Sequence, residues 1–86
     1  MAAWTRLGQV QLALGRVPEA RSSFERALAV APDLIPALLG LGEALLQIGD
    51  VEGAGRAVDR ALELSPDDAR ARELLDRLSR LPTEEP

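Results

Sequence analysis

Apolar residues recur at intervals of three or four positions in two stretches of the chain, as they do along one face of a helix. The two stripes are Ala3, Leu7, Val10 and Leu14, and Ala37, Leu41, Ala44 and Ile48. Each stripe stops at a glycine, Gly15 or Gly49, which can adopt the left-handed conformation that closes a helix. The pattern therefore predicts two helices, each ending at its glycine.

A further apolar stripe follows each glycine and ends at a proline. The residues of these stripes are Ala20, Phe24, Ala27 and Leu28, and Ala54, Val58, Ala61 and Leu62. They predict helices over about residues 18–30 and 52–64, each forming a hairpin with the helix before it. Pro18 suits the first position of a helix, where a missing N–H is tolerated. Asp33 and Asp67 are candidate caps for the helices that follow.

The two hairpins are copies of one sequence unit. A shift of 34 residues aligns residues 1–34 with 35–68 at twelve identical positions, several of them glycine or proline. Ala71 and Leu75 continue two of these columns into a partial third copy. A period of this length is typical of helical repeat proteins, whose units stack on one another.

The identities of the repeated residues resemble the tetratricopeptide repeat family. The first copy carries its signature as Trp4, Leu7, Gly8, Ala20, Phe24, Ala27 and Pro32, and the second keeps Leu41, Gly42, Ala54, Ala61 and Pro66. Gln11 and Leu45 stand where the signature has tyrosine. The resemblance implies an all-α fold, an α-solenoid of antiparallel helix hairpins with two tetratricopeptide units and a C-terminal capping helix.

The chain divides along the period. We expect a single domain over residues 1–81, with repeat 1 at 1–34, repeat 2 at 35–68 and a capping helix at about 68–80, followed by a flexible tail at 82–86. The last helix has one apolar stripe and is otherwise rich in arginine and acidic residues, which suits the solvated end of a stack.

The packing expected of these units follows from residue size. Gly8 and Gly42 would face small alanines of the second helix, while Trp4 and Phe24 would fill the wider ends of the first hairpin. The helix over about residues 36–48 is apolar nearly all round, so it should be packed from several sides. The first helix, by contrast, has an apolar edge with nothing before it to cover it. Upstream repeats of a longer chain, or a second copy in a homodimer, would cover this edge.

Composition then narrows the function. The chain has no Cys, His, Lys or Tyr, so thiol chemistry, zinc sites and histidine catalysis are excluded, and Ser22, Ser23 and Ser65 have no His or Lys to activate them. We expect no enzyme activity, no cofactor and no metal. The net charge of −4 is the wrong sign for nucleic acid. No apolar run is long enough to cross a membrane, and we expect a cytoplasmic protein.

The resemblance also implies where a partner binds. In this family the first helices of the hairpins line a concave face that holds peptides or partner helices. The residues placed there by resemblance are Thr5, Gln9, Leu12, Leu39, Glu43, Leu46, Gln47, Arg70, Glu73 and Arg77. Leu12, Leu39 and Leu46 fit a groove floor and a packed core equally well.

Three functions remain open from the sequence. The first is a non-catalytic module that binds a protein or peptide in the groove. The second is self-association or assembly through the uncovered first helix, and the third is an accessory domain of a larger enzyme. One subfamily holds the acidic tails of chaperones with a clamp of Lys, Asn and Arg side chains. Only Arg70 keeps a clamp charge in this chain, which argues against that function.

Overall fold

The structure is a computed structural model that describes residues 2–81. Within that range it contains five α-helices and no strand. The helices are α1 (Ala2–Ala13), α2 (Val17–Val30), α3 (Ile35–Ile48), α4 (Val51–Leu64) and α5 (Ala69–Ser79). Each predicted helix is therefore confirmed to within one or two residues at its ends. The tail expected at 82–86 lies outside the described residues.

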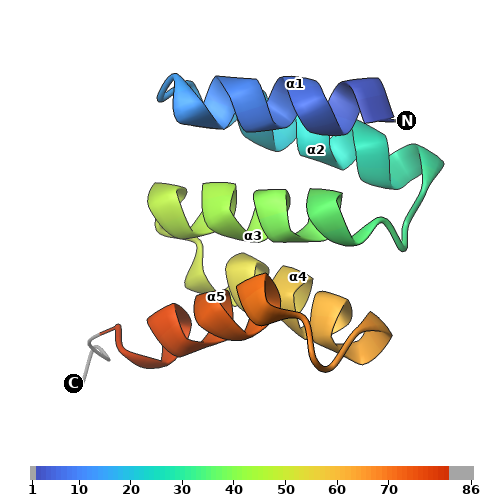
Figure 1. The fold of residues 1–86 in the computed structure, drawn as a ribbon. Coiled ribbons are helices and arrows are strands. Elements are labelled where there is room, and N and C mark those ends of the chain that lie inside the picture. The colour runs from blue at the N-terminus through green and yellow to red at the C-terminus, as the bar shows by residue number, and fades with distance from the viewer. Residues whose placement is uncertain (1, 82–86) are drawn as a thin grey trace.

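The helices form two antiparallel hairpins and a final helix, stacked in chain order. Figure 1 shows α1 and α2 at one end, α3 in the middle, and α4 and α5 at the other end. Each helix packs mainly on its neighbours in the chain, and α3 also contacts α1 and α5. The all-α solenoid is confirmed, and α3 is the helix packed from several sides, with seven buried residues.

The two hairpin turns use glycine as predicted. Gly15 and Gly49 have φ values of 81° and 99°, in the left-handed region that other residues rarely adopt. At the second turn, the amide of Gly49 donates to the carbonyl oxygens of Leu45 and Leu46, so the last carbonyls of α3 are satisfied.

The expected helix caps were wrong by position. Leu34, not Asp33, is the residue before α3, and it makes no side-chain cap. Asp68, not Asp67, caps α5 by accepting a hydrogen bond from the amide of Ala71 at 3.0 Å. An unpredicted cap is made by Asp50, which accepts from the amide of Gly53 at 2.9 Å.

The apolar core consists of two clusters along the stack. One lies between α2 and α3 and contains Ala20, Phe24, Ala27 and Ala37. The other joins α3, α4 and α5 and contains Leu38, Leu39, Val58, Ala61, Ala71 and Leu74. Together they bind the two hairpins and the final helix into one continuous stack.

The small-residue prediction holds only in part in the second hairpin, where Gly42 approaches the backbone of Ala54 but also the larger Val58, and it fails in the first. A Cβ on Gly42 would lie 3.7 Å from the Cβ of Ala57 and 3.3 Å from Val58 Cγ2. Gly8 instead faces the ring of Phe24, which is fully buried and also abuts Gly40 of α3. Trp4, by contrast, is partly exposed at the surface between α1 and α2.

Candidate functional site

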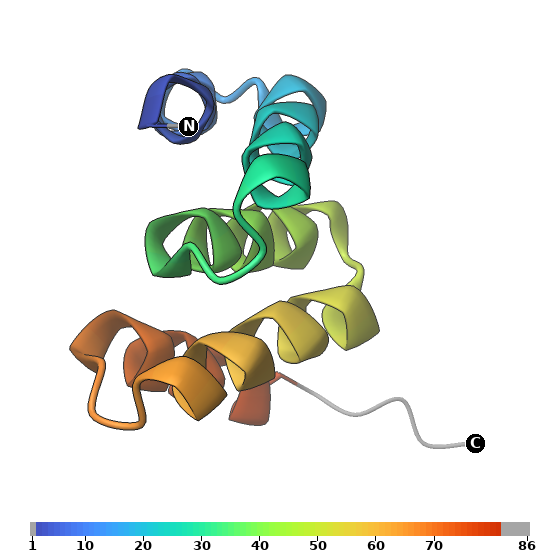
Figure 2. The ribbon, with the colours of Figure 1, turned by 90° about the vertical axis from the view of Figure 1, so that its right-hand side faces the viewer.

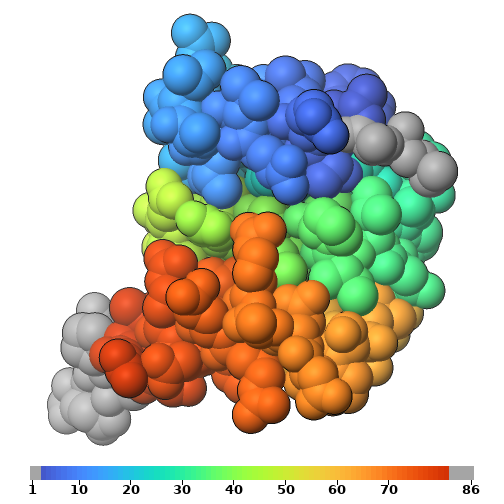
Figure 3. All heavy atoms as spheres, in the orientation of Figure 1, coloured from blue at the N-terminus to red at the C-terminus, as the bar shows by residue number. Residues whose placement is uncertain are grey.

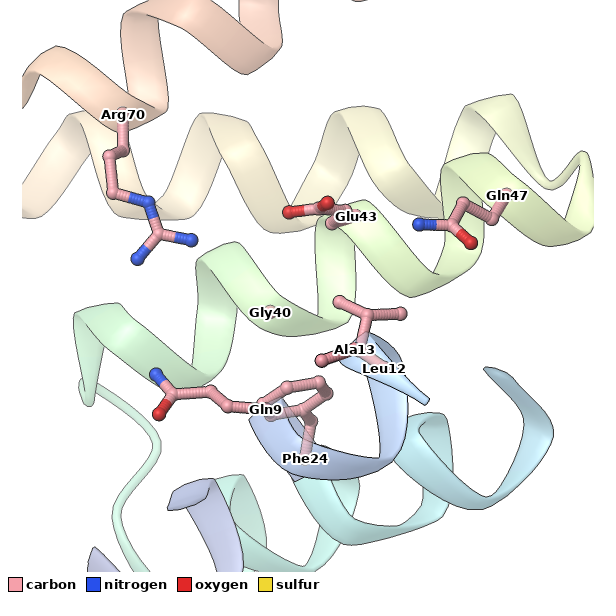
Figure 4. A pocket seen from close by; sticks show the side chains of 8 residues that line it. All are labelled: Gln9, Leu12, Ala13, Phe24, Gly40, Glu43, Gln47 and Arg70. Atoms are coloured by element: carbon pink, nitrogen blue, oxygen red, sulfur yellow. The ribbon is translucent and has the colours of Figure 1, made fainter. Parts of the chain in front are cut away.

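The first helices of the successive units, α1, α3 and α5, share one face of the molecule (Figure 3). A hollow of about 290 Å³ lies on this face. The residues that line it come from four helices and are shown in Figure 4: Gln9, Leu12, Ala13, Phe24, Gly40, Glu43, Gln47 and Arg70. We call this hollow the concave groove.

The walls of the concave groove are polar. Gln9 stands on α1, Glu43 and Gln47 on α3, and Arg70 extends from α5 toward α3 (Figure 4). Glu43 is half-buried and the other three are exposed. Within residues 2–81, neither Glu43 nor Arg70 takes part in an ion pair. Both charges are therefore available to a ligand.

The floor of the groove depends on two glycines that sandwich an aromatic ring. A Cβ on Gly8 would lie 2.8 Å from Cε1 of Phe24, and a Cβ on Gly40 would collide with the same ring. Because neither glycine has a side chain, the ring packs directly against the backbones of α1 and α3. Phe24 thus fixes how closely α1 and α3 approach each other beneath the groove.

The structure brings together half of the residues predicted for the groove. Gln9, Leu12, Glu43, Gln47 and Arg70 all line the same hollow. Leu12 is half-buried against the cluster around Phe24, so it contributes an apolar edge to the groove while packing on the core.

The remaining predicted residues lie elsewhere. Leu39 is 2% exposed in the cluster with α4 and α5, and Thr5 is 6% exposed, so neither presents a side chain to a partner on this surface. Leu46 is half-buried against the same cluster. Glu73 and Arg77 are exposed on α5 outside the hollow.

Sequence reasoning missed Ala13, Phe24 and Gly40 as groove residues. Phe24 belongs to a second helix of a hairpin, where the resemblance placed only packing residues. Gly40 did carry a signal, because the other two members of its repeat column are the large residues Arg6 and Leu74. A glycine in place of a large side chain marks a close approach by another group.

The ion pairs formed within residues 2–81 lie away from the groove. Arg60 on α4 donates to Asp33 at 2.6 Å and to Glu63 at 3.2 Å, and these hydrogen bonds raise the pKa of the Arg60 guanidinium. Arg60 and Asp33 connect α4 to the loop before α3. The pairing is exposed and adds little to stability, and it does not involve the groove residues Glu43 and Arg70.

Comparison with known protein families matches residues 5–69 with the tetratricopeptide repeat. The match covers most of the chain and both hairpins, so the chain belongs to the tetratricopeptide repeat family. Repeats of this family generally mediate protein–protein interactions and are typically non-catalytic. Comparison with curated proteins gave no match. Over residues 2–81, no helix has both the length and the apolar character needed to cross a membrane.

Proposed function

We propose that the protein is a non-catalytic binding module that holds a peptide or a partner helix in the concave groove. The observation that carries this proposal is the convergence of Gln9, Glu43, Gln47 and Arg70, from three helices, on one hollow with an apolar floor. Ligand sites commonly combine an apolar surface with a few convergent polar groups.

The lining indicates what kind of ligand fits. The amides of Gln9 and Gln47 each offer two N–H donors and one acceptor oxygen, which match the backbone groups of an extended peptide. Leu12 and Ala13 offer an apolar edge to one of its side chains. Arg70 and Glu43 add one charge of each sign, so an extended segment that carries an acidic and a basic residue complements the groove.

The volume limits the size of the ligand. About 290 Å³ is at the lower end of the range of small-ligand sites, roughly 300–1,000 Å³. A short segment of a partner fits this space, whereas a folded domain does not. The aromatic ring at the site, Phe24, is fully buried, so contact with the ligand is made by aliphatic and polar groups and we expect modest affinity.

The assignment as non-catalytic is also part of the proposal. Ser23 is held by a hydrogen bond that its hydroxyl donates to Oε1 of Gln11 at 2.6 Å, and this amide cannot act as a base. The hydroxyl of Ser79 donates to the carbonyl oxygen of Leu75. Neither hydroxyl is placed as a nucleophile beside a proton acceptor.

Selection from a displayed library of random twelve-residue peptides tests the proposal. A selected peptide should bind the wild type and lose at least about tenfold in affinity to Arg70→Glu, because an unpaired charge of the wrong sign is left in the groove. Arg72→Glu is the matched control, since Arg72 is exposed on the same helix but does not line the hollow. Equal binding to both variants, or no selected peptide at all, would refute the groove as the binding site.

A further inference from the structure

A second hollow, of about 570 Å³, lies between α1 and α2 at the N-terminal end of the stack. We call this surface the open face and define it by Trp4, Leu7, Gln11, Glu19, Ser22 and Arg26, which all line the hollow. Figure 2 shows no helix of residues 2–81 beyond α1 and α2 at this end. Within residues 2–81, the open face is therefore not covered by another helix.

The second hairpin carries the equivalent surface, and there a helix covers it. The residues 34 positions further along line a hollow to which α2 contributes Arg21 and Glu25. Under this cover Leu38 is 6% exposed, whereas Trp4, its counterpart on the open face, is 36% exposed. The fold thus builds this kind of surface to receive a helix.

The charges of the open face form a pattern that its counterpart lacks. Glu19 and Arg26 are exposed, line the same hollow, and stand seven residues apart on α2, which is about 10 Å along the helix axis. In the part of the chain that the structure describes, neither takes part in an ion pair. The equivalent positions in the second hairpin, Gly53 and Arg60, do not hold opposite charges.

We propose that the open face is the interface of a two-fold symmetric dimer with a second copy of this chain. In such a dimer every contact occurs twice, so a face that carries both partners of an ion pair is complementary to itself. Antiparallel packing of the two α2 helices places Glu19 of each copy against Arg26 of the other. Ser22 lies between them and is small enough for the helices to approach closely.

The apolar part of the face supports the same arrangement. Trp4 and Leu7 flank α2 and are 36% and 43% exposed, and the Cζ atom of Arg26 lies 5.0 Å from the centroid of the Trp4 ring. Tryptophan and arginine are enriched in protein interfaces. A helix of another protein would need an acid and a base at the same spacing, whereas a second copy supplies both.

The dimer is compatible with ligand binding in the concave groove. Leu7 and Gln11 lie on the open face, while Gln9 and Leu12 of the same helix line the groove. Since the two surfaces share no lining residue, loss of one function does not imply loss of the other.

Charge exchange tests the proposed pairing in the 86-residue chain. Sedimentation equilibrium should show a dimer that dissociates on dilution. Glu19→Arg and Arg26→Glu should each weaken it at least about tenfold, because like charges then meet twice. An equimolar mixture of the two variants should dimerise again, since each residue at position 19 then faces an opposite charge at position 26 of the other copy. Trp4 is the only Trp, and there is no Tyr, so its emission should shift to shorter wavelength as the dimer forms.

Glu52→Arg is the matched control, because Glu52 is also exposed in the first turn of its helix but lies outside the open face. It should leave the dimer intact, and circular dichroism should show that all variants are folded. A wild type that remains a monomer up to about millimolar concentration would overturn the proposal and leave the face to a helix of another repeat. Single variants that dimerise like the wild type, or a mixture that does not recover, would also overturn it.

Discussion

The first hairpin packs on the second through Phe24 of α2 and Gly40 of α3. The second hairpin packs on the final helix through Val58 and Leu74, which lie 34 residues further along the chain than Phe24 and Gly40. In the first interface the large side chain comes from the earlier helix and the later helix contributes none. In the second, both side chains are of middle size and belong to one buried cluster. The first interface is therefore filled by one large side chain, and the second by two side chains of middle size.

The two repeats also differ at a second pair of equivalent positions, within each hairpin. Within the first hairpin, Ser23 donates a hydrogen bond to Gln11, while the equivalent pair in the second hairpin is Ala57 and Leu45. The polar pair lines the hollow of the open face, and the apolar pair lies where α2 covers the second hairpin. In both cases the two residues that pack against each other change together, so the repeats preserve the packing of the pair and not the identity of either residue.

Removing the large side chain should have the greatest effect. Phe24→Ala should lower the free energy of unfolding by about 3–5 kcal/mol, because it empties the space between α1, α2 and α3. Val58→Ala should cost roughly 2–3 kcal/mol, since it removes two methyl groups and leaves a smaller cavity. Urea unfolding followed by circular dichroism measures both. A larger loss for Val58→Ala would contradict this difference between the two interfaces.

Replacing Phe24 and Gly40 with the residue types of the second interface tests whether the two positions share one space. Gly40→Leu alone should destabilise by about 1–3 kcal/mol or more, because a Cβ at this position already collides with the Phe24 ring. The double variant Phe24→Val, Gly40→Leu reproduces the Val58 and Leu74 pair and should return to within about 1.5 kcal/mol of the wild type. A double-mutant cycle from urea unfolding gives the coupling. Additive losses would mean that the two positions do not share one space.

The fold could be predicted because its signals are local. Gly15 and Gly49 end their helices through their own backbone freedom, and the prolines and small residues recur at a fixed period. The caps were harder, because Asp67 and Asp68 are adjacent and only the starting residue of α5 decides which one caps it. Asp33, the other expected cap, instead pairs with Arg60 on α4, 27 residues away.

The groove could be predicted only in part because burial depends on which helices cover a residue. The sequence placed Gln9, Glu43 and Leu39 on first helices, and the structure confirms that placement. It did not reveal that α4 and α5 bury Leu39, nor that Phe24 reaches under α3 to meet Gly40. The contacts of Leu39 with α5 and of Phe24 with Gly40 join different repeats, and the period of a single sequence does not encode such pairs.

The start of the second helix in each hairpin offers a smaller test. Arg16 precedes α2 with φ −89° and ψ 70°, close to the −86° and 81° of Asp50 before α4, yet only Asp50 makes a cap. Arg16→Asp should therefore raise the free energy of unfolding by about 1 kcal/mol. Arg16→Ala is the control for loss of the arginine. If Arg16→Asp and Arg16→Ala have the same Tm in thermal unfolding, the first hairpin does not use a cap at this position.

The smallest expected effect separates two glycines inside α4. A Cβ on Gly55 would contact nothing within 4 Å, so Gly55→Ala should stabilise the helix by about 0.5–1 kcal/mol. A Cβ on Gly53 would lie 2.5 Å from Oδ2 of Asp50 and 3.1 Å from Cδ1 of Leu45. Since the amide of Gly53 also donates to the Asp50 cap, Gly53→Ala displaces that carboxylate and should cancel or reverse the gain in helix propensity.

The difference between these two substitutions tests whether the cap requires the glycine. In an Asp50→Ala background the carboxylate is absent, so Gly53→Ala should recover most of the gain seen for Gly55→Ala, less the contact with Leu45. The first hairpin already has Glu19 at the position of Gly53 and no cap at Arg16. Urea unfolding of the four variants decides the point: if Gly53→Ala is equally unfavourable with and without Asp50, the crowding arises at Leu45 and the cap does not select for glycine.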